Sequence, residues 1–553
     1  MEKLIKVLYK NEVYDYPENT KLLDIAKDFQ KDFAYPILVG RVDNDIEELS
    51  YTLTKKCKID FYDRSSIIGN AIYSRGVHFM MIVAAKKVLG NDIEVIIEHS
   101  MDKGVYCEIV NKEINENDIK LIEDKMIELH NNNYKFIKLS VLRRDAINFF
   151  KKKKQVDKIN VLKYISNSYV NLYRLDEYYD YFFSELPDST KALDDFKLTY
   201  IKDNGFVLSY PSVNDPKHTS DYSHHEKLFD TFLEYTEMGK TVEVTTAADL
   251  NHVVSTGNYN YLIQIAEAHY NNQLAKATDM ITQNKNIKVV LLAGPTSSGK
   301  TTTSKKMEIY LKARGYNTHS ISTDDYFYNL VDTPKKENGE YDFESIRAVD
   351  TDLFNKQILK LLSGERVLLP EYNFILGKRE YKKKWLQLKE NDIIVIEGLH
   401  ALNPELTLAI DDSAKFKIYI SPLTLLNIDN HNRIHTSDTR RLRRIIRDNK
   451  YRGYNASDTL KSWQSIQEGE EEFVYPYQNN ADIIINSALI YELGVLKTYA
   501  EPLLFSVSED DEVYPEAIRL INFLRNFLPI PSDDVPKDSV LREFIGGSCF
   551  YEN

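Results

Sequence analysis

A glycine- and hydroxyl-rich octapeptide, GPTSSGKT, spans Gly294–Thr301 and has the spacing G-x-x-x-x-G-K-[ST]. It follows an apolar run and precedes a helical pattern, so the loop N–H groups and the positive helix end should face one centre. Phosphate oxygens bind such a centre. We expect Lys300 to reach the outer phosphates and the Thr301 hydroxyl to bind Mg²⁺. The predicted phosphate-binding residues are Gly294, Pro295, Thr296, Ser297, Ser298, Gly299, Lys300, Thr301 and Thr302.

One acidic position supports this interpretation. Glu397 ends the apolar run IIVIE and precedes a glycine. A carboxylate at the end of a buried strand, beside a phosphate loop, is typical of a Mg²⁺ site. Strands that end in Glu-Gly are also common without any such role. With the loop upstream, we predict that Glu397 and Thr301 hold Mg²⁺ on the bound phosphates.

The elements that must position these residues begin near Ile287. From there, apolar runs that suit buried parallel strands alternate with helical patterns, which predicts a doubly wound α/β domain. The runs are KVVLLAG, THSIST, DIIVIEG, KFKIYIS and ADIIINSA. Residues 225–285 have a mostly helical pattern. The preceding part mixes short strands and helices, and we expect Thr20 to cap the first helix.

Length and composition favour a multidomain cytoplasmic protein. The 553 residues exceed one core, and 43% hydrophobic and 28% charged residues are ordinary values for a globular chain. No run of about 18 apolar residues predicts a membrane span, and the N-terminus lacks the apolar segment of a signal peptide. Three widely spaced cysteines argue against a disulfide framework. The net charge of −13 disfavours broad nucleic-acid binding.

Beyond the phosphate loop, residues 287–490 resemble the uridine kinase and phosphoribulokinase family of P-loop kinases. The matching motifs, in order, are STDDYFY, YDFESIRAVDTDLF, LPEYNF, IVIEGLHAL, SDTRRLRRIIRDNKYRG and ADIIIN. The resemblance implies ATP-dependent phosphorylation of a nucleoside 5′-hydroxyl, uridine or cytidine first, with Mg²⁺. Another sugar or nucleoside acceptor is the alternative among kinases.

The resemblance also implies roles for single residues. A sugar hydroxyl is a poor nucleophile at neutral pH, so a carboxylate should take its proton. Asp324 matches the family's strand-end Asp, with Asp325 or a helix-cap role for Asp324 as alternatives. Asp342 matches a residue that binds ribose hydroxyls, Tyr372 an aromatic residue near the nucleoside, and Arg379 is retained in the substrate site. The predicted catalytic residues are Asp324, Lys300 and Glu397.

The arginine-rich motif resembles the lid of the family. In a helix, Arg440, Arg444 and Arg447 share one face, and a planar guanidinium suits phosphoryl oxygens. We predict that Arg443 and Arg444 bind ATP and that Arg440 and Arg447 bind the substrate. The alternative is a solvated basic helix face.

The sequence departs from the family at the nucleobase contact. Uridine kinases carry a His after the tyrosine motif, close to the base. Here Gly377 stands at that place, and Asn373 replaces an Asp. The sequence therefore leaves the preferred base open.

The front half resembles the front end of threonyl-tRNA synthetases. Residues 1–62 resemble the small ubiquitin-like domain, and residues 63–220 resemble the editing-type domain that follows it. That family combines a His pair with a later Cys and His. Ser74 and His78 stand at the first pair, and the later donors are missing. We therefore expect neither zinc nor deacylase activity, but a binding or scaffold role toward RNA or a regulatory ligand.

The predicted fold is multidomain α/β. Its parts are a β-grasp-like domain at 1–62, a degenerate editing-type α+β domain at 63–220, a helical connector at 221–286 and a P-loop doubly wound parallel-sheet kinase domain at 287–553. The alternative to a kinase is a regulatory nucleotide switch that acts on RNA or the translation machinery. A guanine-reading N-K-x-D motif is absent, and a switch would not need the acceptor residues. We expect a homo-oligomer without a membrane partner.

Overall fold

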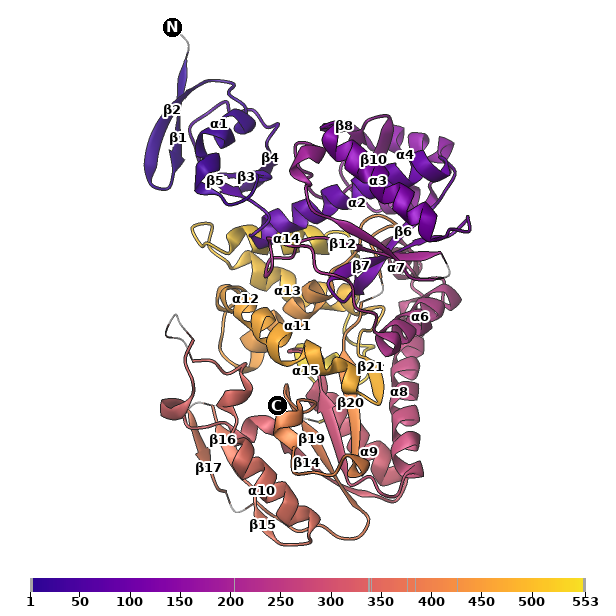
Figure 1. Cartoon of the computed structure of the whole chain (residues 1–553), viewed down its shortest axis with the longest axis vertical. Helices are drawn as coiled ribbons and strands as arrows, with labels where there is room; N and C mark the ends of the chain where they lie inside the picture. Colours follow the sequence, from indigo (N-terminus) through magenta and orange to yellow (C-terminus); the bar gives the residue numbers. More distant parts are fainter. Residues whose placement is uncertain are drawn as a thin grey trace.

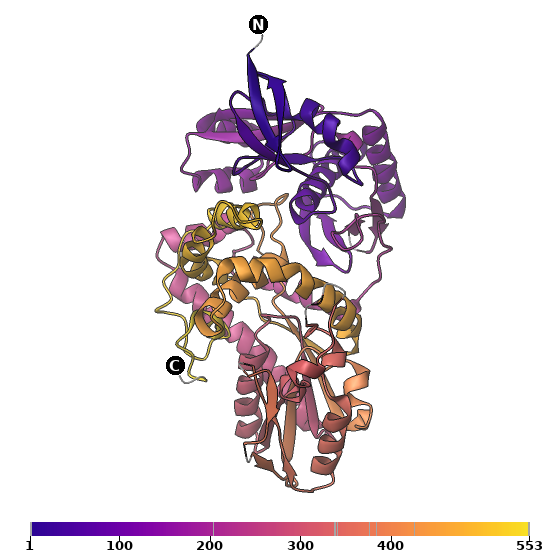
Figure 2. The ribbon, with the colours of Figure 1, turned by 90° about the vertical axis from the view of Figure 1, so that its left-hand side faces the viewer.

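The computed structural model describes residues 3–550, apart from residues 203, 337, 338, 340, 375, 383 and 425. The N-terminal half lies at one end of the long axis, and the parallel-sheet domain lies at the other (Figure 1). The long helix α8 (Tyr259–Gln283) runs along one side of the parallel-sheet domain. A view turned by 90° shows the same two tiers, with the last helices of the chain between them (Figure 2).

The first domain is a five-stranded sheet packed on one helix. Its elements are β1 (Leu4–Tyr9), β2 (Glu12–Pro17), α1 (Leu22–Phe29), β3 (Val39–Val42), β4 (Asp45–Glu48) and β5 (Cys57–Tyr62). The strand order is β2-β1-β5-β3-β4, with β1 and β5 parallel. The predicted Thr20 cap is wrong, because Lys21 forms a β-bridge with Thr52 and the helix starts one residue later. The Thr20 hydroxyl instead donates to the carbonyl of Pro17.

The second domain places two antiparallel sheets around a buried helix. Its elements are α2 (Ile67–Leu89), β6 (Val95–Met101), β7 (Gly104–Ile109), α3 (Glu116–Asn131), β8 (Phe136–Leu142), α4 (Arg143–Lys152), α5 (Val156–Lys163), β9 (Tyr169–Leu175), β10 (Tyr178–Tyr181), β11 (Lys197–Tyr200) and β12 (Gly205–Ser209). The strand orders are β11-β12-β7-β6 and β10-β9-β8. By length and composition α2 could cross a membrane, but 72% of its apolar window is buried inside the protein, as in a core helix.

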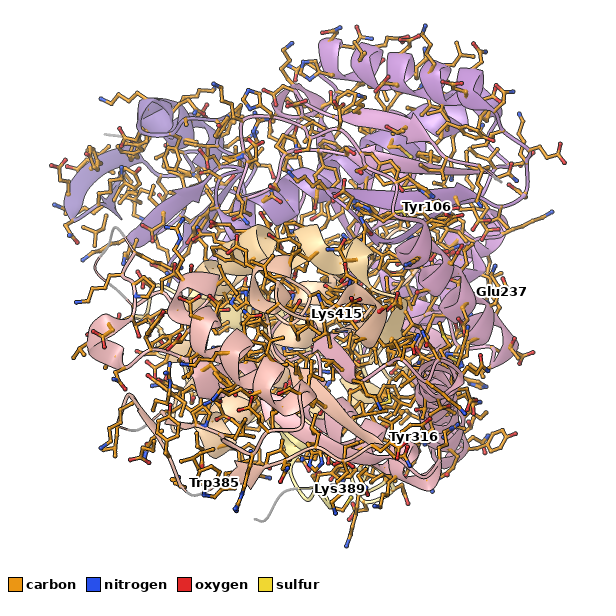
Figure 3. All side chains as sticks on the ribbon, turned by 60° about the horizontal axis from the view of Figure 1, so that its bottom comes forward. Tyr106, Glu237, Tyr316, Trp385, Lys389 and Lys415 are labelled. Atoms are coloured by element: carbon orange, nitrogen blue, oxygen red, sulfur yellow. The ribbon has the colours of Figure 1, made fainter. Side chains whose placement is uncertain are left out.

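A helical connector leads into the parallel-sheet domain. It consists of α6 (Glu226–Thr241), α7 (Ala247–Ser255) and α8. In Figure 3, Glu237 of α6 and Tyr316, which precedes the strand β14, lie on the same side of the molecule. The prediction of a mostly helical segment at 225–285 is confirmed.

The five predicted apolar runs form one parallel sheet. Its strands are β13 (Val289–Ala293), β14 (Asn317–Ser322), β19 (Asp392–Glu397), β20 (Lys415–Ser421) and β21 (Ile483–Asn486), in the order β14-β19-β13-β20-β21. Both faces are covered because alternate residues of β13 point to opposite cores. Leu292 packs with α8, α9 (Lys300–Ala313), α11 (Thr436–Tyr451) and α13 (Glu492–Phe505). Leu291 packs with α10 (Thr351–Leu362) on the other face.

The C-terminal region holds further short strands and helices outside this sheet. They are β15 (Val367–Leu368), β16 (Glu371–Asn373), β17 (Lys378–Glu380), β18 (Trp385–Leu386), α12 (Ala456–Phe473), α14 (Tyr514–Leu524) and the single-turn α15 (Arg542–Ile545). α11 contacts α12, α13 and α15. The helices that carry the arginine motif and the end of the chain therefore pack as one group.

A buried ion-pair network joins the front half to the loop after β20. Lys158 of α5 is fully buried, and its Nζ lies 2.9 Å from Asp180 of β10 and 2.8 Å from Asp429 of that loop. The same loop also bonds to the edge strand β6, because the Ile97 N–H donates to the Asn430 carbonyl at 2.8 Å. This loop runs directly into α11, so the arginine helix is anchored on the front half.

We predict that Lys158→Met lowers the free energy of unfolding by about 3–5 kcal/mol, because it leaves the Asp429 carboxylate buried without its cation and Asp180 with His431 alone. Urea denaturation followed by circular dichroism measures the change. Lys163→Met, on the exposed face of the same helix, is the matched control. Equal denaturation midpoints for the two variants would contradict a structural role for the buried network.

A cavity of about 290 Å³ lies where β6, α6 and the loops after β20 and β21 meet, and Glu98 lines it. Burial raises the pKa of this carboxyl to about 7. The folded state therefore holds the proton more tightly than the unfolded state, and this stabilisation is lost as pH rises through about 7.

In Glu98→Gln the side chain has nearly the shape of the protonated carboxyl and is uncharged at every pH. We predict that it raises the melting temperature at pH 8 and leaves it nearly unchanged at pH 5. Thermal melts at the two pH values measure the difference. A larger gain at pH 5 than at pH 8 would show that the carboxyl is not protonated in the folded state.

Candidate active site

The phosphate loop connects β13 to α9 and has the backbone of an anion cradle. Ser297 (φ 58°) and Gly299 (φ 87°) are both left-handed, which turns consecutive N–H groups toward one side. A Cβ at Gly294 would lie 2.1 Å from the carbonyl oxygen of Ile420, so no side chain fits there. Gly299 occupies the N-cap position of α9. The predicted strand–loop–helix context is therefore confirmed.

Strand register brings the predicted catalytic residues together. Glu397 pairs with Leu292 of β13 on one side and with Ser322 of β14 on the other. The carboxyl ends of these parallel strands meet at one edge, where ligands bind in such sheets. Burial lowers the pKa of Lys300, which the charges of Glu397 and Asp324 oppose. The three predicted catalytic side chains thus form one electrostatic cluster.

Burial also governs the two carboxyls of this cluster. It raises the pKa of Asp324, and the charges of Lys300 and Arg452 counteract the rise. It raises the pKa of Glu397 to about 7, with a further contribution from the negative charge of Asp324. A buried carboxyl with a raised pKa is suited to accept a proton near neutral pH.

The two neighbouring aspartates differ in their contacts. Asp325 accepts a hydrogen bond from the backbone N–H of Tyr372 at 3.2 Å, so it fixes the start of the β16 strand. Asp324 lies in the charge field of Lys300. The helix-cap alternative for Asp324 is wrong, because Ser322 caps this 3-10 turn by accepting from the Asp324 N–H. These contacts favour Asp324 over Asp325 as the base.

Thr301 at the start of α9 and Glu397 at the end of β19 suit Mg²⁺. The Thr301 hydroxyl and the Glu397 carboxylate are hard oxygen donors, which this ion prefers. Mg²⁺ usually takes its other ligands from water and substrate phosphates, so few protein donors suffice. Within the described part of the chain, no group of three or more His, Cys, Asp or Glu side chains is arranged to hold a metal.

The predicted one-sided face of the arginine helix is confirmed. Arg440 donates from Nε to the Thr296 carbonyl at 3.0 Å, and Arg444 donates to the Thr296 hydroxyl at 2.7 Å. One helical turn on, Arg447 lies 3.7 Å from Glu543 of α15. Arg440 and Arg444 therefore contact the phosphate loop itself. Arg447 lies near Glu543, which accepts from Thr302 at the start of α9.

The alternative of a solvated basic face is wrong, since Arg440 and Arg443 are almost fully buried. Arg440 also pairs with Glu470 of α12 and donates to Tyr475. Arg443 pairs with Glu492 at 2.7 Å and donates to the Ser297 carbonyl. Both arginines therefore donate hydrogen bonds to carbonyls of the phosphate loop and pair with glutamates of the protein. The predicted ligand contacts of Arg440 and Arg443 stay predictions.

An aromatic cluster lies beside the strand-end carboxylates. Phe327 follows the 3-10 turn of Asp324, and its ring centre lies 5.7 Å from those of Phe343 and Tyr372. Asp342 directly precedes Phe343 and is half-buried. Within the described residues, the buried hydroxyl of Tyr372 has no hydrogen-bond partner. Apolar rings with a few polar groups suit the base and ribose of a nucleoside.

Arg379 and Gly377 lie near this aromatic cluster. The Arg379 guanidinium pairs with Asp350 at 3.0 Å and donates to the carbonyls of Tyr326 and Phe327. It therefore positions the aromatic segment, and its direct contact with substrate stays a prediction. Gly377 has φ 60°, and a Cβ there would lie 2.9 Å from Leu330 Cβ. Any side chain at this position would therefore require Leu330 to shift.

Two glutamates contact the phosphate loop and the start of α9, and no sequence pattern predicted either contact. Glu470 accepts from the Thr296 N–H at 2.7 Å. Glu543 accepts from the N–H and hydroxyl of Thr302 at 3.1 and 2.9 Å. Both come from helices far along the chain, and neither lies in a recognisable motif. Only their position after the arginine segment could have suggested them.

The residues of the front half that the sequence analysis compared with metal donors are buried. The hydroxyl of Ser74 donates to the carbonyl of Ala71, as in a core helix. His78 is 2% exposed, and burial lowers its pKa well below the usual range. His99 stacks on Phe232 with ring centres 3.6 Å apart. Burial raises the pKa of the Cys107 thiol. These groups are packed, neutral side chains.

Known proteins resemble the C-terminal region. Residues 289–491 match the Phosphoribulokinase / Uridine kinase family. A uridine kinase of Halobacterium salinarum is 29% identical over 195 residues, which cover 35% of this chain and 77% of the relative. A uridine kinase of Bacillus pumilus is 28% identical over 198 residues, which cover 36% and 85%.

One solved structure, D-glycerate 3-kinase from Cryptococcus neoformans, aligns at 16% identity. The alignment covers 50% of this chain and 89% of that chain, with a TM-score of 0.22, which is too low to support an argument. The family match spans the phosphate loop, the strand-end carboxylates and the parallel sheet. The C-terminal region is therefore an ATP-binding P-loop domain of the phosphoribulokinase and uridine kinase type, and the protein is a kinase.

Proposed function

We propose that the protein transfers the γ-phosphoryl group of ATP to the 5′-hydroxyl of a nucleoside, with uridine or cytidine as the acceptor. The observation that carries this proposal is the meeting of three features at one sheet edge. These are the phosphate loop, the buried pair Asp324 and Glu397, and the aromatic cluster around Phe327. A nucleotide switch would have no use for the last of these features.

The chain's own residues would divide the chemistry. The loop N–H groups and the start of α9 bind phosphate oxygens. Lys300, whose Nζ now donates to the carbonyls of Gly294 and Pro295, can turn to the transferring phosphate. Asp324 accepts the proton of the attacking hydroxyl, and the raised pKa of its carboxyl suits that step.

Several residues would hold the two substrates. Thr301 and Glu397 would hold Mg²⁺, which neutralises charge on the phosphates when bound. Arg444 and Arg447 on α11 would contact phosphoryl oxygens from the other side. Asp342 would accept hydrogen bonds from the ribose hydroxyls, and Tyr372 would pack on the nucleoside. Uridine kinases among the relatives support a pyrimidine nucleoside as the acceptor.

The front half supports a separate, non-catalytic role. We propose that residues 1–62 are a ubiquitin-like domain and that residues 63–220 are a degenerate editing-type domain that binds a regulatory ligand or RNA. Packed His78, His99 and Cys107 support the absence of hydrolytic chemistry there. The ion pairs of Lys158 with the loop before α11 would carry such a signal to the arginine helix.

The direct test measures ADP release from Mg·ATP with and without each of a panel of nucleosides. We expect release that depends on uridine or cytidine. Lys300→Ala should reduce it by at least 10³-fold, because the transferring phosphate loses a cation that stabilises its charge in the transition state. Nucleoside-independent hydrolysis in the wild type would favour the nucleotide switch instead. Full turnover in the variant would refute the assignment of the loop.

A second prediction separates the two aspartates. Asp324→Asn should lower kcat by about 10²-fold or more and leave the Michaelis constant for ATP nearly unchanged, because it removes a general base. Asp325→Asn serves as the matched control, and it should mainly raise the Michaelis constant for the nucleoside through the Tyr372 backbone. Steady-state kinetics measure both. A large loss of kcat in Asp325→Asn alone would move the base to Asp325.

A further inference from the structure

The start of α9 is already occupied by a carboxylate of the same chain. Glu543 of α15 accepts from the backbone N–H of Thr302 at 3.1 Å and from its hydroxyl at 2.9 Å. The first N–H groups of a helix have no partner within the helix and attract anions. A carboxylate and a phosphate offer these donors the same kind of oxygen. Glu543 therefore fills a position that suits a phosphate group.

The segment that carries Glu543 packs directly on the phosphate loop. We call residues 531–548 the capping segment. A Cβ at Gly299 would lie 2.3 Å from Val540 Cγ2, so the segment covers the backbone of the loop. Asp538 pairs with Lys306 of α9 at 2.8 Å. The Phe544 ring lies 5.0 Å from the guanidinium of Arg443. These contacts hold the residues around Glu543 beside the loop, while the Glu543 side chain reaches the start of α9.

Glu543 also meets the positive charge that the arginine helix supplies. Arg447 lies 3.7 Å from its carboxylate. Glu397 is affected as well, because burial raises its pKa and the negative charges of Asp324 and Glu543 add to the rise. The Glu543 carboxylate therefore contacts the start of α9 and lies near Arg447 of α11. Its negative charge also helps to raise the pKa of Glu397.

We propose that Glu543 is an internal competitor of the nucleotide, which binds by displacing the Glu543 carboxylate from the start of α9. This regulation rests on the proposed phosphate-binding role of the loop. Two anions at one helix start repel each other and share the same donors, so they exclude one another. When the carboxylate leaves, Arg447 is released to contact the phosphates.

The contacts of Glu543 allow such displacement. α15 is only four residues long, and Gly546 (φ 91°) and Gly547 (φ 72°) follow it with left-handed backbones. Glu543 retains 9% exposure at the edge of the site. Glu470, the other carboxylate on the loop, is fully buried and pairs with Arg440. We therefore assign displacement to Glu543 and a permanent structural role to Glu470.

Isothermal titration calorimetry of the full chain with Mg·ADP tests the proposal without any nucleoside. We expect Glu543→Ala to lower the Kd by about tenfold, the value of one charge-assisted hydrogen bond, and Glu543→Gln to lower it less. Glu472→Gln removes the same charge from an exposed position of α12 and is the matched control. Melting temperatures of all variants report whether they fold.

The outcomes separate this proposal from the proposed function. An unchanged or higher Kd in both Glu543 variants, with wild-type binding intact, would overturn the competitor role alone. A loss of melting temperature without tighter ADP binding would show that Glu543 is only a structural cap. Absence of ADP binding by every protein would overturn the phosphate-binding assignment on which the proposal rests.

Hydrogen exchange of the wild-type chain gives a test that needs no variant. The amides of Glu543, Phe544, Ile545 and Gly546 are hydrogen-bonded within the capping segment. We expect Mg·ADP to speed their exchange while it protects the phosphate loop. Slower or unchanged exchange of these four amides on saturation with Mg·ADP would contradict release of the Glu543 carboxylate from the start of α9.

Discussion

The phosphate loop imposes one constraint on the surrounding structure: its N–H groups converge on a single centre and require anionic partners. Burial makes this requirement strict, because an unpaired buried donor costs about 1–3 kcal/mol. In this structure carboxylates from α12 and α15 meet the requirement, through Glu470 at Thr296 and Glu543 at Thr302. The arginines of α11 then balance the charge of these carboxylates. These contacts join α11, α12 and α15 to the phosphate loop.

The same group of helices connects the site to the front half. The loop after β20 carries Asp429 into a fully buried pair with Lys158 and continues directly into α11. On the other side, the hydroxyl of Tyr270 on α8 lies 2.6 Å from that of Thr303 on α9. The front half and its connector thus reach both helices that form the phosphate site. A ligand on the front half would have a short physical route to that site.

The front half buries several side chains that could otherwise bind a metal or take part in catalysis. His78, His99 and Cys107 remain as packed side chains, and Ser74 satisfies its hydroxyl within α2. Burial disfavours the charged forms of these groups, so they are neutral at physiological pH. Arg433 of the loop after β20 reaches into the same region and donates to the Ser100 hydroxyl. This region now joins the two halves of the molecule.

The sequence by itself determined the local features of this protein. The loop spacing, the five apolar strand runs and the helical face of Arg440, Arg444 and Arg447 all depend on residues close together in the chain. Their periods are fixed by backbone geometry, which short-range patterns report. The misplaced cap at Thr20 shows where this approach fails, because a bridge to Thr52 decided the start of that helix.

The tertiary structure alone decided which charges meet. Glu543 lies 241 residues from its partner Thr302, and Glu470 lies 174 residues from Thr296. Neither glutamate belongs to a motif, and no periodicity connects residues so far apart. Whether an arginine of α11 is buried against protein or left for a ligand likewise depends on the helices packed around it. Long-range packing therefore sets the charges around the candidate site and the access to it, whereas the sequence predicts which residues form it.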